Sequence, residues 1–182
     1  MDSTNCDINK KAIENHYIDF MQKVRVTNAY ATVYREKSLR KKSIINTVLG
    51  ILPVALIALI SLKNEWLDVL LVLAAASTVL EAIAKYLPYE KRAEELLMLI
   101  STTDAIVVKL EYVWIQYKHK NHDIDWLVEQ QRDISNDYTK AINNNLVQVT
   151  YPLNKQMEKI ALAKAETQML NLFENDKGDQ NV

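Results

Sequence analysis

Two long apolar stretches separated by a short polar turn constrain the fold of this chain more than any other feature. Residues 43–62 (SIINTVLGILPVALIALISL) carry no charged side chain. A helix of that length, rising 1.5 Å per residue, crosses a hydrocarbon core about 30 Å thick. Residues 66–84 (WLDVLLVLAAASTVLEAIA) form a second apolar run. The sequence therefore predicts a transmembrane helical hairpin with its turn at residues 63–65.

Basic residues flank this predicted hairpin at both of its outer ends, whereas the turn carries only Lys63 against Glu65. Because cytoplasmic flanks of membrane helices are rich in Lys and Arg, we expect a multi-pass protein of the inner (cytoplasmic) membrane with both termini cytoplasmic. The alternative is a buried central hairpin in a soluble helical bundle. The residues expected to contact lipid headgroups are Arg35, Arg40, Lys41, Lys42 and Lys85.

The rest of the chain predicts helices. Its 182 residues include two Gly and three Pro, so helix breakers are few, and no segment shows the alternation of a strand. The predicted fold is an all-α membrane protein, a two-helix transmembrane hairpin with long cytoplasmic amphipathic helices at both ends. We divide it into an N-terminal amphipathic helix (1–42), the hairpin (43–84), a helical region (85–174) and a disordered tail (175–182).

The N-terminal segment shows helical periodicity from residue 7 to about residue 34. Its polar face holds Lys11, Asn15, Gln22 and Arg25, with Ile18 as an exception. With no Gly or Pro before Gly50, this helix can continue into the first apolar run. The apolar face opposite consists of Ile13, Tyr17, Phe20, Val24, Ala31 and Tyr34.

A heptad-like stripe follows the hairpin, in steps of three and four residues. Such a stripe packs on another helix, which belongs either to neighbouring subunits or to the final helices of the same chain. We take Leu96, Leu99, Ile106 and Leu110 as the candidate oligomer interface. The whole stripe is Leu96, Leu99, Thr103, Ile106, Leu110, Val113 and Tyr117.

Turn, cap and linker residues along the remaining chain predict two further helices. Residues 118–121 form a polar turn, and Asp123 is the expected N-cap of the next helix. Residues 143–152 (NNNLVQVTYP) are the best candidate for a linker. The final helix carries one apolar stripe, formed by Leu153, Met157, Ala161, Ala165, Met169 and Leu172.

Polar residues within the predicted hairpin are the candidate functional residues. Glu81, level with Asn46 in an antiparallel hairpin, would form a polar ring at the mouth of an oligomeric pore, and Ser77 and Thr78 lie on the same stripe. The alternative is an interfacial acid paired with Lys85.

Gly50 and Pro53 are the candidate hinge in the first span, because proline removes a ladder donor and kinks a helix. The alternative is a tolerated packing feature.

Composition argues against several classes of function. Cys6 is the single cysteine, and His16, His119 and His122 have no metal-ligand spacing. Two glycines cannot build a phosphate-binding loop. The formal net charge is -1, and the basic block before residue 43 suits anionic lipid better than nucleic acid. We therefore expect no catalytic residue, cofactor, metal or nucleic-acid partner.

The segments around the hairpin resemble a known family. A basic helix (YREKSLRKK), two apolar runs with a very short turn and a charged helix (PYEKRAEELLMLI) resemble the SLATT family. These are two-transmembrane effector domains associated with SMODS nucleotidyltransferases and SLOG sensor domains in prokaryotic conflict systems. The resemblance covers roughly residues 29–117 and is architectural. Its points of match are Tyr34, Arg40, Glu90, Arg92 and Glu95.

The resemblance implies a function in antiphage defence. A SLATT-like effector oligomerises and permeabilises the inner membrane when a signalling or sensor protein encoded nearby is triggered, which causes abortive infection. One hairpin cannot enclose a water path, so homo-oligomers are expected. The alternative function is a non-conducting membrane anchor or scaffold whose cytoplasmic helices bind a partner protein.

Overall fold

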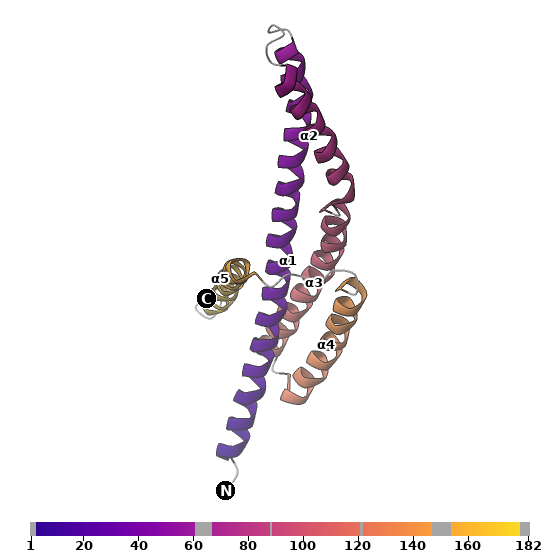
Figure 1. Ribbon diagram of the computed structural model, residues 1–182. Coiled ribbons are helices and arrows are strands. Elements are labelled where there is room, and N and C mark those ends of the chain that lie inside the picture. The colour runs from indigo at the N-terminus through magenta and orange to yellow at the C-terminus, as the bar shows by residue number, and fades with distance from the viewer. Residues whose placement is uncertain (1–2, 61–66, 88, 121, 147–153, 179–182) are drawn as a thin grey trace. The chain divides into compact units, whose positions relative to one another are not determined.

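The computed structural model describes residues 3–60, 67–87, 89–120, 122–146 and 154–178, and nearly all of them are helical (Figure 1). The chain divides into two compact units. Unit 1 comprises Met1–Tyr34 and Glu95–Val182, and unit 2 comprises Arg35–Glu94, so α1 and α3 contribute to both. In chain order the helices are α1 (Ser3–Ile60), α2 (Leu67–Tyr86), α3 (Tyr89–His119), α4 (Ile124–Leu146) and α5 (Lys155–Gly178).

The first helix has no break between the amphipathic segment and the apolar run. α1 continues through Gly50 and past Pro53 to Ile60, which confirms that the N-terminal helix can run on into the first apolar stretch. Threonine hydroxyls along it donate to carbonyls one turn back, as between Thr47 Oγ1 and the Ser43 oxygen at 2.8 Å. Such local bonds satisfy the hydroxyl without a partner on another helix.

The core of unit 1 lies between α1, α3 and α4, with α5 packed against it. Periodic apolar positions on each helix meet there, as the amphipathic pattern predicted. The Trp114 ring stacks on Tyr17, at 5.7 Å between centroids, and meets Phe173 of α5 edge-on. The most deeply buried side chains of this core are Tyr17, Met21, Val24, Leu110, Leu127 and Ile134.

Caps and turns set the ends of the last helices. The Trp126 amide donates to Asp123 Oδ1 at 2.9 Å, which confirms Asp123 as the N-cap of α4. Asn154 caps α5 in the same way, accepting from the Gln156 amide at 3.0 Å. α4 runs to Leu146, into the expected linker, and residues 147–153 lie outside the described residues. α5 extends to Gly178, into the segment that we expected to be disordered.

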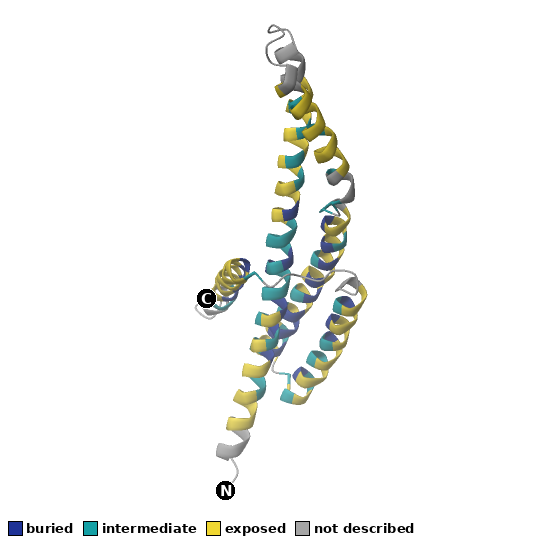
Figure 2. Ribbon diagram, viewed as in Figure 1, coloured by how far each residue is buried: buried dark blue, intermediate teal, exposed yellow. Residues whose placement is uncertain are grey.

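Unit 2 consists of the second part of α1, all of α2 and the start of α3, up to Glu94. Among its described residues only Ser38 and Ala93 are buried. Figure 2 shows the exposed class along both long helices of this unit. The large apolar side chains left exposed are Leu39, Ile44, Val48, Ile51, Val54, Val69, Leu71, Val72, Val79 and Leu80.

The membrane hairpin is the main expectation that the structure overturns. Within the described parts of the chain, no helix is both long and apolar enough to cross a membrane. This contradicts the transmembrane hairpin and the multi-pass inner-membrane localisation.

Residues 43–60 of the first predicted span belong to α1, which begins well before that span, at Ser3. The second predicted span corresponds to α2, whose 20 residues include the charged residues Asp68, Glu81 and Lys85. Residues 61–66, which hold the end of the first predicted span, the turn and Trp66, lie outside the described residues.

Candidate functional site

α3 carries apolar side chains on two faces, and its own chain buries only one of them. The inner face is the stripe found in the sequence, where Leu96 and Leu110 are fully buried. We name the opposite face the outer stripe. Its residues also recur at heptad spacing, in alternating steps of three and four positions. Four of its side chains are large and well exposed: Met98 61%, Val108 64%, Tyr112 60% and Ile115 41%. The outer stripe is Met98, Ser101, Ala105, Val108, Tyr112 and Ile115, all classed as exposed.

The outer stripe has the spacing of a coiled-coil seam. Met98, Ala105 and Tyr112 are seven residues apart and occupy one core position, a; Ser101, Val108 and Ile115 occupy the other, d. A single exposed apolar residue is ordinary on a protein surface, but a row of them at heptad spacing, interrupted here by Ser101, is typical of an association surface. The pattern was present in the sequence, in a second register that the first stripe obscured.

Charged residues border the outer stripe. Asp104 and Glu111 lie on one side of it and Lys109 on the other. Lys109 Nζ donates to Asp137 of α4 at 3.0 Å, and both side chains are about half exposed. A surface pair of this kind stabilises by about 0–1 kcal/mol and exchanges partners easily. Asp104 accepts a hydrogen bond from Asn28 Nδ2 at 2.7 Å.

The residues first taken as the oligomer interface lie inside the chain's own core. Leu96 and Leu99 pack with Ala31 of α1, and Ile106 and Leu110 belong to the main core of unit 1. The sequence left open neighbouring subunits or the final helices of the same chain as the partner of the inner stripe. The structure shows that the stripe packs on α1, which was not among these partners, as well as on the final helices. Side chains buried in this way are not available to a partner.

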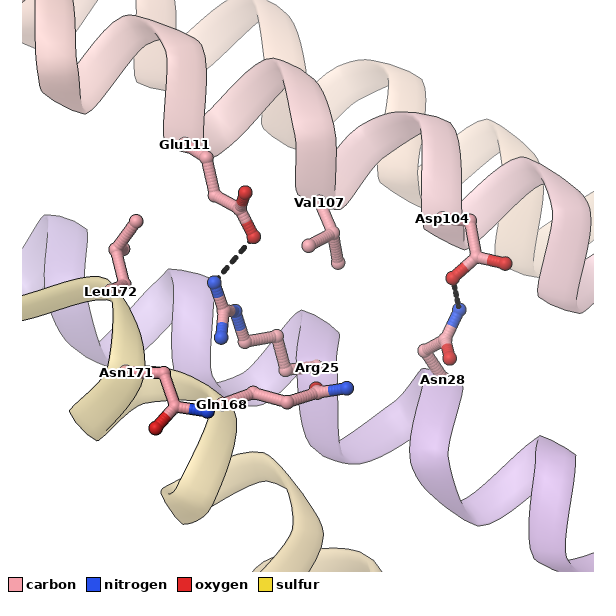
Figure 3. Close-up of a pocket in the computed structure, with 8 residues that line it drawn as sticks. All are labelled: Arg25, Asn28, Asp104, Val107, Glu111, Gln168, Asn171 and Leu172. Atoms are coloured by element: carbon pink, nitrogen blue, oxygen red, sulfur yellow. Dashed lines mark hydrogen bonds and ion pairs between the residues drawn. The ribbon is translucent and has the colours of Figure 1, made fainter. Parts of the chain in front are cut away.

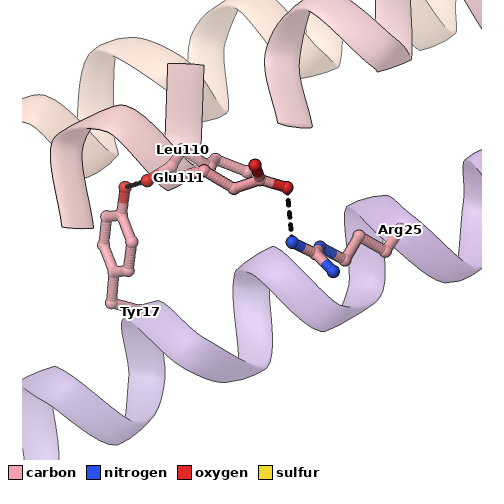
Figure 4. Close-up of polar contacts among 4 residues, drawn as sticks. All are labelled: Tyr17, Arg25, Leu110 and Glu111. Atoms are coloured by element: carbon pink, nitrogen blue, oxygen red, sulfur yellow. Dashed lines mark hydrogen bonds and ion pairs between the residues drawn. The ribbon is translucent and has the colours of Figure 1, made fainter. Parts of the chain in front are cut away.

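A polar cavity of about 320 Å³ lies between α1, α3 and α5 (Figure 3). Arg25 is only 4% exposed and pairs with Glu111 (Figures 3 and 4). Its Nε is buried without a hydrogen-bond partner among the described residues. The cavity is lined by Arg25, Asn28, Asp104, Val107, Glu111, Gln168, Asn171 and Leu172.

Burial of Arg25 corrects the expected polar face of the N-terminal helix. The periodicity placed Arg25 with exposed residues, but α3 and α5 lie against it, as the lining of the cavity shows. Its partner Glu111 is 86 positions away in the sequence. No local pattern signals such a pair, because its two residues meet only once α1 and α3 have packed.

Tyrosines of the core are held in their neutral form. Tyr17 donates to the Leu110 carbonyl at 2.8 Å (Figure 4), and burial raises the Tyr17 pKa. Tyr117 donates to Glu14 Oε1 at 2.9 Å. Burial, together with the hydrogen bond to Glu14 and the charge of that carboxylate, raises the Tyr117 pKa to about 12.

Glu14 has the opposite shift. Its burial works to raise the pKa, but the hydrogen bonds from Lys118 and Tyr117 and the charges of Lys118 and Lys10 outweigh burial and lower it below 4.5. Lys118 Nζ lies 3.1 Å from Glu14 Oε1. These contacts of Glu14 with Tyr117 and Lys118 link the end of α3 to the first part of α1 within unit 1.

In unit 2 the structure brings together two of the polar residues singled out in the sequence. Asn46 and Glu81 line one cavity of about 380 Å³, together with Lys42. Ser77 and Thr78 do not line it. Their hydroxyls donate to the carbonyl of Ala74 on their own helix, at 2.8 and 2.9 Å.

Among the expected hinge and headgroup residues, the structure describes the surroundings of Gly50, Arg35 and Lys42. A Cβ at Gly50 would meet no atom within 4 Å, so no neighbour requires a glycine there. Arg35 Nε donates to the Ala93 carbonyl at 3.3 Å, and Lys42 lines the cavity of unit 2.

Arg40 and Lys41 are exposed, and the side chain of Lys85 lies outside the described residues. The headgroup and pore roles presuppose the transmembrane hairpin, and no contact of the described residues tests them.

The described residues hold no group of three or more His, Cys, Asp or Glu side chains arranged to bind a metal ion. His122 instead stacks on Trp126 at 4.1 Å between ring centroids. No family model matches this chain, and no curated protein or solved structure is significantly similar to it. Among the described residues, the outer stripe of α3 is the best-supported candidate site.

Proposed function

We propose that this chain is a self-associating helical scaffold, in which α3 of one copy packs against α3 of another through the outer stripe. The observation that carries the proposal is the exposed apolar row at heptad spacing on a helix whose opposite face is already buried. This keeps the scaffold alternative from the sequence and names a second copy as the partner. Permeabilisation required spanning helices and is not part of the proposal. A prokaryotic conflict system, implied by the resemblance to SLATT, is retained as its setting.

The physical case for association depends on preorganisation. An isolated helix of three heptads pays a large nucleation cost before it can pair. In this chain the inner stripe already fixes α3, with Leu99 at 1% and Ile106 at 5% exposure. Binding through the outer stripe therefore gains apolar burial, about 25 cal/mol per Å², without the cost of forming the helix.

A second copy is the occupant that the pattern itself supports. A heptad stripe is self-complementary, because the a and d residues of one helix fit the holes of an identical helix. Its charged borders are complementary as well, since acids lie on one side and Lys109 on the other. Two-fold pairing of identical surfaces is also the commonest mode of assembly.

The test is the mass of the native chain in solution. Light scattering across a concentration series should show a dimer or a larger assembly for the wild type. Changing both Val108→Glu and Tyr112→Glu should give a monomer with unchanged helicity, because two acids would be buried in the seam. The matched control is Ile160→Glu, an exposed apolar position on α5 at 54% exposure, which should keep the wild-type mass. A wild-type monomer at about 100 µM, or a double variant that still associates, contradicts the proposal.

A further inference from the structure

We infer that the two α3 helices run parallel and in register, with Asp104 of one copy facing Lys109 of the other. The inference rests on the proposed self-association and adds its geometry. Residues at the g and e positions beside an apolar seam set partner orientation in coiled coils. Asp104 and Glu111 occupy g, each one residue before an a position, and Lys109 occupies e, directly after Val108.

In a parallel pair, a g residue faces the e residue five positions later on the other helix. This rule pairs Asp104 with Lys109 of the second copy, on both sides of the seam by symmetry. It pairs Glu111 with Gln116, which is neutral and can donate a hydrogen bond. The parallel arrangement therefore places no like charges together in the described part of the seam.

In an antiparallel pair, g residues face g residues. Aligning the a and d layers then brings Asp104 opposite Glu111 of the second copy, twice, and leaves Lys109 without an acid across the seam. Arg25 holds Glu111 toward α1, which weakens this repulsion but supplies no attraction. The charges at both borders thus favour the parallel arrangement.

Side-chain volume does not choose between the two orientations. The antiparallel layers would pair large with small residues, such as Tyr112 with Ser101. The parallel layers pair each residue with its own copy, including Tyr112 with Tyr112. Both sets can be packed, so orientation is decided at the borders.

Contacts within one chain leave the required groups available. Asp104 is exposed, and its bond from Asn28 uses Oδ1, so the other carboxylate oxygen can accept from a second chain. Lys109 is 47% exposed and its partner Asp137 49% exposed. An ammonium has three donors, so Lys109 can hold Asp137 and also reach an acid across the seam.

Cysteine cross-linking distinguishes the arrangements. In a Cys6→Ser background, we would oxidise Ser101→Cys and Tyr112→Cys variants separately and as a mixture. Parallel, in-register helices place each core position against its own copy, so both single variants should form disulfide dimers. Cross-linking only in the mixture, between positions 101 and 112, shows an antiparallel pair and overturns the inference while supporting self-association. Single variants that do not cross-link although the chain remains associated also overturn it. A monomer under all conditions overturns the proposed function as well.

Charge reversal gives an independent readout. Asp104→Lys alone and Lys109→Asp alone should each weaken dimerisation about tenfold, because each change turns an attractive pair into a repulsive one on both sides of the seam. Mixing the two single variants should restore wild-type affinity as a heterodimer. The control Asp133→Lys, on exposed α4 surface, should have no effect. Equal affinities for the single variants and their mixture contradict the assigned pairing.

Discussion

The two units of this protein differ in how far they bury their apolar side chains. In unit 1 each of four helices buries one apolar stripe, although the outer stripe of α3 stays exposed, and Tyr17, Leu110 and Leu127 have no exposed surface. In unit 2 large aliphatic side chains such as Leu71 at 62% and Val72 at 69% remain exposed. A high apolar content does not by itself make a core, because each stripe needs another element to cover it.

The difference follows from how the apolar residues are arranged on each helix. α4 has polar and apolar residues on separate faces, so burial of one face leaves a hydrated one. In α2 apolar residues surround the helix, as in the segment VLLVLAAA. Two such helices cannot cover all of each other, and much of their apolar surface stays exposed within one copy of the described chain.

The largest predicted effect compares one leucine from each unit. Leu110→Ala should lower the free energy of unfolding by about 2–5 kcal/mol, because it leaves a cavity in a packed core. Leu71→Ala should change it by less than about 0.5 kcal/mol, since the side chain is exposed. Urea unfolding followed by circular dichroism measures both. A loss of similar size for Leu71→Ala would show that unit 2 is covered in the native assembly, and the contrast between the units would fail.

A smaller effect is expected from the ion pair inside unit 1. Glu111→Ala should lower stability by about 2 kcal/mol, because Arg25 is left buried and unpaired; partial exposure of Glu111, at 31%, limits the loss. Arg25→Met should lie within about 1 kcal/mol of wild type, since an apolar side chain of similar length removes the buried charge and leaves Glu111, which is 31% exposed, in contact with water.

The comparison for this pair is Lys109→Met at the exposed pair with Asp137, where the change should stay below about 0.5 kcal/mol. Thermal unfolding of the three variants provides the measurement. If Arg25→Met were the most damaging of them, Arg25 would have a role beyond pairing with Glu111.

The smallest effect is a pH dependence at the Glu14 cluster. The folded-state pKa of Glu14 is lowered, so its stabilisation is present above the unfolded value of about 4.5 and is lost as the pH falls through the folded value. Glu14→Gln should therefore reduce stability at pH 7 by about 1 kcal/mol or less, because Lys118 is 35% exposed. The two proteins should converge in acid. A difference that persists at pH 3 would assign the effect to lost packing.

The helices could be predicted from the sequence, but the polar cavity of unit 1 with its Arg25–Glu111 pair could not. Heptad and amphipathic spacing correctly placed α3, α4 and α5 and identified Asp123 as a cap, since these features depend on neighbours within one or two turns. The same spacing put Arg25 on a solvated face. Its burial depends on Glu111 and α5, which the chain brings near only after folding.

The membrane hairpin shows how far the hydropathy of a short sequence window can be used to predict a membrane span. A charge-free run predicts a span from length and composition alone. The structure instead shows that run as the continuation of a charged helix in α1, and it shows α2 with charged residues near both of its ends. The same pattern of apolar residues is therefore compatible with more than one environment, and no local rule decides between them.

By itself the sequence determined the helices, their caps and the two apolar stripes of α3, because helix formation and amphipathicity are local properties with a period of 3.6 residues. The tertiary structure decided which stripe of α3 becomes core and which is left for a partner. The two stripes are alike in spacing and differ only in what lies opposite them. The inner one faces α1 and α4, far away along the chain, and this long-range packing leaves the outer stripe exposed.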